Sequence, residues 1–185
     1  VALMGTLFYL FHDILVKTNM FLIAGLIRQL RGTMDMKKLG GLYAEYPKIS
    51  LLIALILFSL VGIPPLSGFW PKLYLFEEAF THQQYFFVGA LILGSFVTLF
   101  VIAKMWSEVF WKNIPEGVTV ENKFEPMSLI QKIILVAPIC ILGAATIYIG
   151  LNAESVVQLV DKISDQLLDT KPYVDAVLNK STAQL

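Results

Sequence analysis

The feature that most limits how this chain can fold is a set of three long stretches without a charged residue. They cover residues 49–71, 79–103 and 133–153, which is 23, 25 and 21 residues. A helix of about 20 apolar residues spans the hydrocarbon core of a bilayer, which is about 30 Å thick. Only 15% of the residues are charged and 57% are hydrophobic, whereas soluble domains carry about 25% charged residues. The sequence therefore predicts an integral membrane protein.

The start of the chain forms a fourth apolar stretch, which holds His12, Asp13 and Lys17 near its middle. Because lipid offers no partner to backbone N–H and C=O groups, we predict that all four stretches are helices. This all-α fold has a transmembrane domain over residues 1–152, with helices at about residues 2–29, 49–80, 84–112 and 128–152. The apolar pattern is already under way at Val1, so we expect a piece of a longer polytopic protein.

Residues 153–185 follow the last predicted span and differ from it in character. Apolar side chains recur there at helical spacing, with charged and polar side chains between them: Val156, Leu159, Val160, Ile163 and Leu167. This pattern predicts an amphipathic helix followed by a polar tail. The helix lies on the membrane surface or on a partner subunit, or it simply caps the domain.

The loops predict an orientation in the cell (plasma) membrane. The loop over residues 31–48 and its flanks are the most basic connection, with Arg28, Arg31, Lys37, Lys38 and Lys48. Cytoplasmic loops are enriched in Lys and Arg, so we place this loop in the cytoplasm. The next connection holds acidic residues and no Lys or Arg, which suits the outer side. The third loop then returns to the cytoplasm, and the C-terminal tail lies outside.

The composition argues against several other classes of protein. Fourteen basic and 14 acidic residues cancel, and no basic run exists, so a nucleic-acid partner is not expected. Cys140 is the only cysteine, and His12 and His82 lie far apart. Neither a disulfide framework nor a metal site is therefore expected. No phosphate loop, nucleophile elbow or cofactor motif is present, so we predict no cofactor and no catalytic residue.

Three ionisable residues near the middle of the first predicted span are candidates for function, because charges inside a membrane are costly. Asp13 and Lys17 are four residues apart, so they share one helix face and can pair. His12 lies about 140° around the helix from Lys17, and a histidine is suited to passing protons. The three residues form either a proton relay or a structural ion pair that locks this helix to its neighbours.

The second span contains a predicted helix break over residues 62–68. Pro64 and Pro65 remove backbone donors, and Gly62 and Gly68 relax the backbone. Broken helices near mid-membrane line polar cavities and mark ion sites in transporters. Lys72 follows the break by one turn, so its ammonium is expected beside opened backbone carbonyls. The alternative is a proline kink with Lys72 extending to the membrane surface.

The third span carries Lys104 and Glu108, one helical turn apart. Lys104 is either the last station of a proton path before the cytoplasm or half of an interfacial ion pair with Glu108. The fourth span has no charge between Ile133 and Ala153, so we assign it a packing role only.

Three sequence runs together resemble the antiporter-like subunits of Mrp-type multisubunit Na⁺/H⁺ antiporters and of respiratory complex I. The run FHDILVKTNMFLIAG over residues 11–25 resembles the helix of this family that carries a histidine and a lysine. The glycine-containing loop over residues 36–42 and the broken-helix motif over residues 62–72 follow in the same order. The histidine stands five residues before Lys17, and Asp13 occupies the place of the complex I histidine. That spacing resembles D-type Mrp subunits more than complex I subunits. A lysine rather than a glutamate at 72 also disfavours the M-type complex I subunit.

The resemblance implies roles for four residues. Lys17 matches the relay lysine, with His12 beside it, and Lys72 matches the lysine of the broken helix in a half-channel to the outer side. Lys104 matches a basic residue on the next span. The family fold implies about 14 helices with inverted repeats, of which this chain would supply the last four. A lone chain of this length would then be an incomplete half-channel.

Three functional hypotheses follow. The first is part of a secondary transporter subunit that exchanges a monovalent cation, Na⁺, for protons beside other subunits in the lipid bilayer. The second is a proton-pumping membrane-arm subunit of complex I or a related hydrogenase, which acts as a translocase powered by a redox reaction. The third is a structural membrane module in which the charges only pair and pack.

Overall fold

The computed structural model describes residues 2–119, 121–169, 171 and 174, and within these residues the chain is all helical. The long helices and half-helices are α1 (Ala2–Arg31), α3 (Pro47–Val61), α4 (Phe69–Thr81), α5 (Tyr85–Trp106), α6 (Leu129–Leu151) and α7 (Ala153–Leu168). Short turns complete the path: η1 (Met36–Lys38), α2 (Leu42–Glu45) and the π-helical turn η2 (Ser107–Trp111). The all-α prediction is confirmed.

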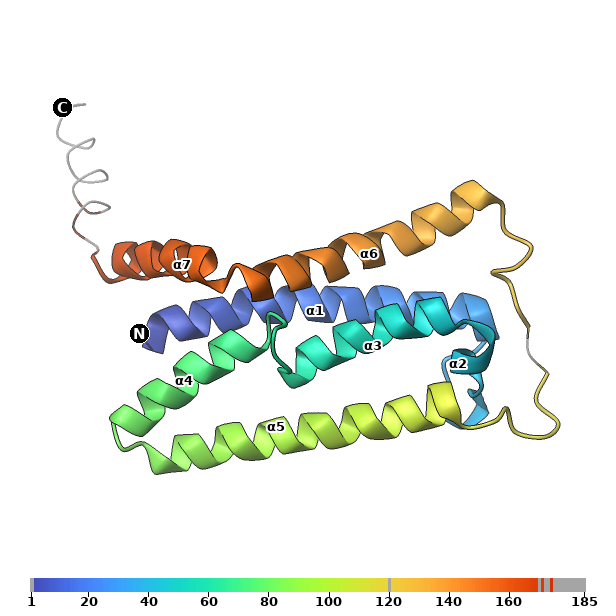
Figure 1. Cartoon of the computed structure of the whole chain (residues 1–185), viewed down its shortest axis with the longest axis horizontal. Helices are drawn as coiled ribbons and strands as arrows, with labels where there is room; N and C mark the ends of the chain where they lie inside the picture. The colour runs from blue at the N-terminus through green and yellow to red at the C-terminus, as the bar shows by residue number, and fades with distance from the viewer. Residues whose placement is uncertain (1, 120, 170, 172–173, 175–185) are drawn as a thin grey trace.

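Three of these elements are long and apolar enough to cross a membrane by length and composition: α1, α5 with its π-helical turn, and α6. α3 is a shorter apolar helix. The second predicted span is therefore two half-helices, α3 and α4, which meet end to end (Figure 1). The predicted third helix, residues 84–112, is a helix to Trp106 and a π-helical turn to Trp111.

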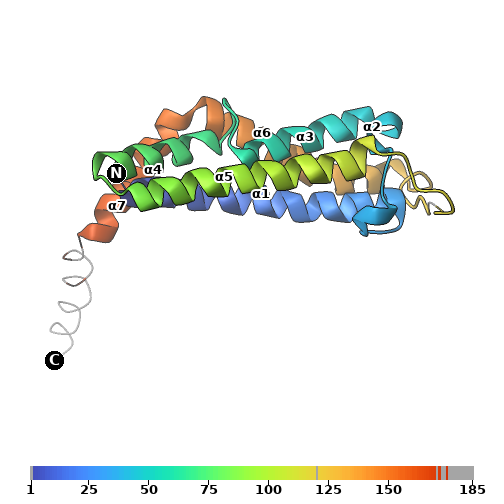
Figure 2. The ribbon, with the colours of Figure 1, turned by 90° about the horizontal axis from the view of Figure 1, so that it is seen from below.

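α1 lies between α6 and α7 on one side and α3 and α4 on the other in the view of Figure 1, and it packs against all four. In the view of Figure 2, α1 runs along one edge of the bundle. α5 packs against α3 and α4. The buried face of α1 follows the three- and four-residue spacing of a helix stripe, through Phe8, His12, Val16, Asn19 and Ile23. This stripe puts His12 inside the bundle with the apolar core.

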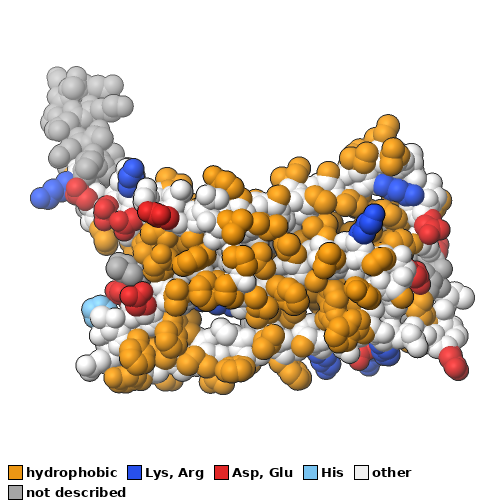
Figure 3. All heavy atoms as spheres, viewed as in Figure 1, with side chains coloured by type: hydrophobic (Ala, Val, Ile, Leu, Met, Phe, Trp, Pro, Cys, Tyr) orange, Lys and Arg blue, Asp and Glu red, His pale blue; other side chains and the backbone are white. Residues whose placement is uncertain are grey.

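Hydrophobic side chains cover the middle of the bundle, and charged side chains gather toward its ends (Figure 3). Large apolar side chains face outward, among them Phe86, which is 93% exposed, and Phe21, which is 80% exposed. Exposed apolar area of this extent is expected where a helix faces lipid or another protein.

The loop after α1 is held to the bundle by Arg31, which the sequence placed in the basic loop. Arg31 is 3% exposed, and its guanidinium donates to the carboxylate of Glu45 at 2.8 Å and to the carbonyl of Gly40 at 2.7 Å. The backbone N–H of Gly41 donates to the carbonyl of Lys112. Arg31 therefore braces this end of the bundle, and the orientation of the loop in the membrane stays a prediction.

The predicted amphipathic helix after the last span is present as α7. Ala153 and Val160 are buried against α1 beside Met4 and Phe8. Its apolar face thus caps this chain's own first helix, while Leu167 and Leu168 stay exposed. Most of the predicted polar tail lies outside the described residues.

Candidate functional site

The break between α3 and α4 is the point where polar groups meet inside the bundle. α3 ends at Val61, and its C-cap residue Gly62 has a φ of 93°, in the left-handed region that favours glycine. Its N–H bonds to the carbonyls of Phe58 and Ser59. The connection then runs through Pro64 and Pro65 to Gly68, and α4 begins at Phe69. The break lies where the sequence predicts it.

Lys72 binds the two carbonyls that the prolines leave without a donor. In a helix, the carbonyls of Leu60 and Val61 would accept from the N–H groups four residues later, but those residues are Pro64 and Pro65. Neither has an N–H. The Lys72 ammonium donates to Val61 at 2.7 Å and to Leu60 at 3.2 Å. The expectation of a lysine beside opened carbonyls is thus met.

His12 meets the same break from α1. Its Nδ1 lies 2.9 Å from the hydroxyl oxygen of Ser67, and that oxygen lies 3.2 Å from the hydroxyl oxygen of Ser59. His12 is 1% exposed, and both serines are 0% exposed. Three separate segments therefore contribute to one buried polar chain.

The two glycines of the break leave room for these side chains. A Cβ atom on Gly62 would lie 3.3 Å from Nζ of Lys72 and 3.2 Å from the carbonyl oxygen of Gly68. A Cβ atom on Gly68 would overlap the carbonyl oxygen of Ser59 and lie 2.8 Å from Nε2 of His12. His12 and Lys72 thus approach one short backbone segment.

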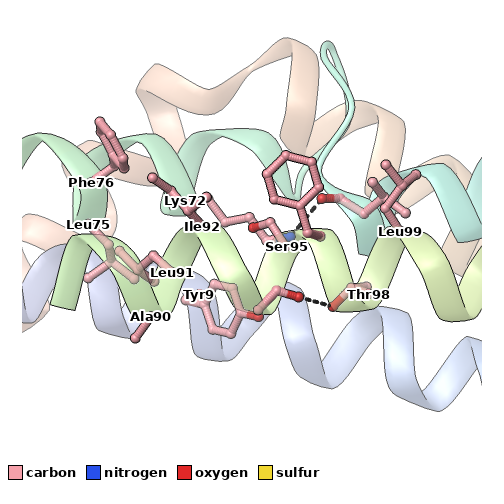
Figure 4. A pocket seen from close by; sticks show the side chains of 13 residues that line it. Tyr9, Lys72, Leu75, Phe76, Ala90, Leu91, Ile92, Ser95, Thr98 and Leu99 are labelled. Carbon is pink, nitrogen blue, oxygen red and sulfur yellow. Dashed lines mark hydrogen bonds between the residues drawn. The ribbon is translucent and has the colours of Figure 1, made fainter. Parts of the chain in front are cut away.

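A cavity of about 520 Å³ lies between α1, α4 and α5, and Lys72 lines it (Figure 4). Tyr9, Ser95 and Thr98 supply the other polar side chains, and the remaining lining is mostly apolar. The Thr98 hydroxyl donates to the carbonyl of Gly94 at 2.8 Å. The cavity gives the ammonium of Lys72 a neighbouring space large enough for several water molecules.

Asp13 and Lys17 form the predicted ion pair, with 2.7 Å between the carboxylate oxygen and Nζ. The Lys17 side chain is 63% exposed and that of Asp13 is 22% exposed. The pair lies on the face of α1 turned away from the buried stripe, since Lys17 is about 140° around the helix from His12. Lys17 and His12 therefore do not share one local cluster.

Lys104 lies on the exposed side of α5 and is not part of the cavity lining. The alternative of a Lys104–Glu108 ion pair is wrong in this structure, because Glu108 pairs with Lys112 at 2.8 Å. Both lysines are four residues from Glu108, and the π-helical turn over Ser107–Trp111 changes the register between them. Of the four proposed path residues, only His12 and Lys72 meet at the break.

α6 braces the break from the other side, which the sequence did not suggest. The indole N–H of Trp70 donates to the carbonyl of Gly150 at 2.7 Å. A Cβ atom on Gly150 would overlap the carbonyl oxygen of Pro65, so only glycine permits this approach. The fourth span thus contacts the break directly, in addition to its packing role.

Sequence reasoning also missed Ser59 and Ser67. Both are serines within an apolar span, and buried hydroxyls need a hydrogen-bond partner. This need could have indicated that each serine bonds to another polar group, but the sequence does not show which group. In the part of the chain that the structure describes, no three His, Cys, Asp or Glu side chains gather as metal ligands would.

The chain also matches a known protein family. Residues 1–98 match the family described as "NADH:quinone oxidoreductase/Mrp antiporter, TM", which is more than half of the chain. The chain belongs to this family. The match confirms the resemblance drawn from the histidine-and-lysine helix and the broken helix, and it supports a multi-pass membrane protein.

Two curated relatives are, by name, D-type subunits of Na(+)/H(+) antiporters. The chain is 34% identical over 179 residues to that of Alkalihalophilus pseudofirmus, covering 97% of this chain and 35% of the relative. It is 31% identical to that of Bacillus subtilis, with the same shares covered. The chain spans about a third of the length of these relatives.

A solved structure, the Mrp complex from Dietzia sp. DQ12-45-1b, contains a chain with the same fold. The match has a TM-score of 0.78 at 24% identity, and it covers 95% of this chain and 40% of the other. At this identity the likeness shows that the two chains share a fold.

Proposed function

We propose that this chain is part of a subunit of a monovalent cation/proton antiporter, exchanging Na⁺ for protons, and that it carries part of the proton path. The observation that carries the proposal is the Lys72 ammonium, bound to the carbonyls of Leu60 and Val61 at the edge of a cavity. The names of the two antiporter relatives support the choice of antiport.

The chemistry of Lys72 suits a proton station. Its two acceptors are neutral carbonyl oxygens, and among the described residues no carboxylate pairs with it. Loss of its proton therefore leaves no unpaired anion behind, and carbonyl dipoles solvate the charged form when the proton returns. His12, on the other side of the break, is a second group able to take and release a proton.

Lys17 and Lys104 complete the proposed path. Lys17 pairs with Asp13 on the outward face of α1, where further protein or water has to contact it, because a lipid-facing charge is costly. Lys104 lies beyond the cavity on α5. In this proposal the path is assembled with other subunits, in a plasma membrane with loop 31–48 in the cytoplasm and the tail outside.

A second candidate is a proton-pumping membrane-arm subunit of complex I or a related hydrogenase. The description of the matched family supports this second candidate, because the description names NADH:quinone oxidoreductase together with the Mrp antiporter. Both candidates use the same proton groups, and a redox reaction drives only the second. Purification of the intact complex separates them: co-purified subunits with a quinone-reducing peripheral arm would favour the second candidate.

Substitution of Lys72→Met in the complete subunit tests the first candidate. We expect antiport to fall by about 100-fold or more, the scale of a lost acid–base group, while the complex still assembles. The control is Lys132→Met, because the Lys132 ammonium also donates to a backbone carbonyl, that of Glu125, at 3.0 Å but on an exposed surface. Normal antiport by Lys72→Met in a vesicle pH-gradient assay would contradict the proposal.

A further inference from the structure

Two buried serines, Ser67 and Ser59, form a row of hydrogen-bond contacts that begins at His12. The Ser67 hydroxyl lies 2.9 Å from Nδ1 of His12 and 3.2 Å from the Ser59 hydroxyl. Ser59 belongs to α3, Ser67 to the connection before α4, and His12 to α1. The orientation of the imidazole is therefore tied to the backbone on both sides of the break.

These hydroxyls are satisfied in an unusual way for serines in or near a helix. Helical Ser and Thr commonly bond to the carbonyl four residues earlier, as Thr98 does with Gly94 and Thr146 does with Leu142. Ser67 instead contacts a side chain 55 positions away in the sequence. Because a buried hydroxyl needs a partner, this bond selects the position of the His12 ring.

The other side of the ring faces the break itself. A Cβ atom on Gly68 would lie 2.8 Å from Nε2 of His12, so Nε2 is presented to the backbone segment that Lys72 also approaches. A neutral imidazole has one donor nitrogen and one acceptor nitrogen. If Ser67 donates to Nδ1, Nε2 carries the hydrogen. If Ser67 donates to Ser59, Nδ1 carries it and Nε2 presents a lone pair.

We propose that Ser67, supported by Ser59, is a positioning residue that sets the ring orientation and the tautomer of His12 at the helix break. A change of tautomer adds a proton to one ring nitrogen and removes a proton from the other, with both protons exchanged along the proposed proton path. Rotation of the two hydroxyl groups then accommodates the new tautomer without movement of the backbone. This inference rests on the proposed function, because it assigns the switch to a histidine of the proton path.

The tautomer of His12 is measurable without any transport assay. We suggest labelling histidine ring nitrogens with ¹⁵N in the assembled complex and identifying the His12 signals by their loss in His12→Gln. In Ser67→Ala the ratio of the two neutral tautomers is expected to change by about fivefold or more, the factor that one net hydrogen bond supports. Ser59→Ala should change it less, because the bond from Ser67 to His12 survives.

Ser50→Ala is the matched control. Ser50 is also buried in α3, at 1% exposure, and its hydroxyl donates to the carbonyl of Leu42 at 3.2 Å, far along the helix from the break. It should leave the His12 signals unchanged. If Ser67→Ala fails to accumulate, Ser67→Cys keeps the side-chain volume and weakens the bond. Unchanged His12 signals in the Ser67 variants, or equal changes in Ser50→Ala, would overturn the inference.

A double-mutant cycle of Ser67→Ala and His12→Gln, measured by antiport, distinguishes failure of this inference from failure of the proposed function. Ser67→Ala should lower antiport and move its pH profile in the wild-type background, with no further effect in His12→Gln. Equal losses in both backgrounds would show a merely structural serine and overturn the positioning role. Normal antiport in His12→Gln would instead remove His12 from the proton path, while the ¹⁵N result still decides whether Ser67 sets the tautomer.

Discussion

Lys72 and Lys17 are two lysines of one membrane bundle whose charges are stabilised in different ways. Lys72 is solvated by two neutral carbonyl oxygens at a helix break. Lys17 is held by the carboxylate of Asp13, on a face where 63% of the lysine side chain is exposed. Carbonyl dipoles favour the ammonium without an opposite charge, whereas the ion pair leaves an anion behind when its proton departs.

The two lysines also differ in how much of their surroundings this chain supplies. The backbone carbonyls that bind Lys72, the residues that line its cavity and His12 at the same break all belong to this chain. The site at Lys17 is open outward. We therefore expect changes at the break to act on both folding and transport, and changes at Lys17 to act mainly on transport in the full assembly.

Gly68→Ala should have the largest effect, because it strikes the shared segment of the break. The added Cβ atom would overlap the carbonyl of Ser59 and crowd Nε2 of His12. Overpacking of this kind costs about 1–3 kcal/mol or more of stability, so accumulation and thermal midpoint should fall and antiport should be lost. Gly25→Ala is the control, since nothing lies within 4 Å of its Cβ position. Equal tolerance of both changes would show that the break is not tightly packed.

Asp13→Asn should lower antiport by about tenfold or more, because it leaves the Lys17 ammonium without its carboxylate partner. Asp13→Asn should also lower the thermal midpoint, because the Lys17 ammonium loses its partner. The double change Asp13→Asn with Lys17→Gln removes both charges, so we expect antiport to stay low while the thermal midpoint recovers. Vesicle antiport and thermal unfolding of the same preparations measure the two effects. Intact transport in the double variant would support a structural module at this pair.

Lys104→Ala should reduce antiport by less than Lys72→Met does. Its side chain is exposed on α5 and does not line the cavity at Lys72, so its removal leaves the contacts of Lys72 intact. The comparison is with Lys112→Ala, a nearby lysine that pairs with Glu108. A loss as deep as that of Lys72→Met would make Lys104 an equal member of the path.

Trp70→Phe should have the smallest effect. It removes the 2.7 Å bond to the carbonyl of Gly150 while keeping most of the aromatic contact, so the expected loss is about 1 kcal/mol of stability. Trp111→Phe is the control, because Trp111 is 68% exposed. A thermal-unfolding shift shared by both variants would argue against a brace between α6 and the break.

Local rules predicted much of the fold and one half of the site. Charge-free length indicated the spans, Pro64 and Pro65 indicated the break, and the four-residue spacing indicated the Asp13–Lys17 pair. The acceptors of Lys72 also follow from local rules, since two consecutive prolines must leave the carbonyls four residues earlier without donors. These features depend on neighbours within a few positions along the chain.

The remaining features join segments that are far apart in the sequence. A membrane-spanning α-helical chain with charged groups inside its spans follows from the residues alone, because hydrophobicity and backbone hydrogen bonding are set residue by residue. The inward turn of His12 to Ser67, the outward turn of Lys17 and the approach of Gly150 to the break became visible only in the folded bundle. The physical reason is packing: which face of a helix is buried depends on its neighbours, and the contacts made by His12 and Gly150 each span dozens of residues.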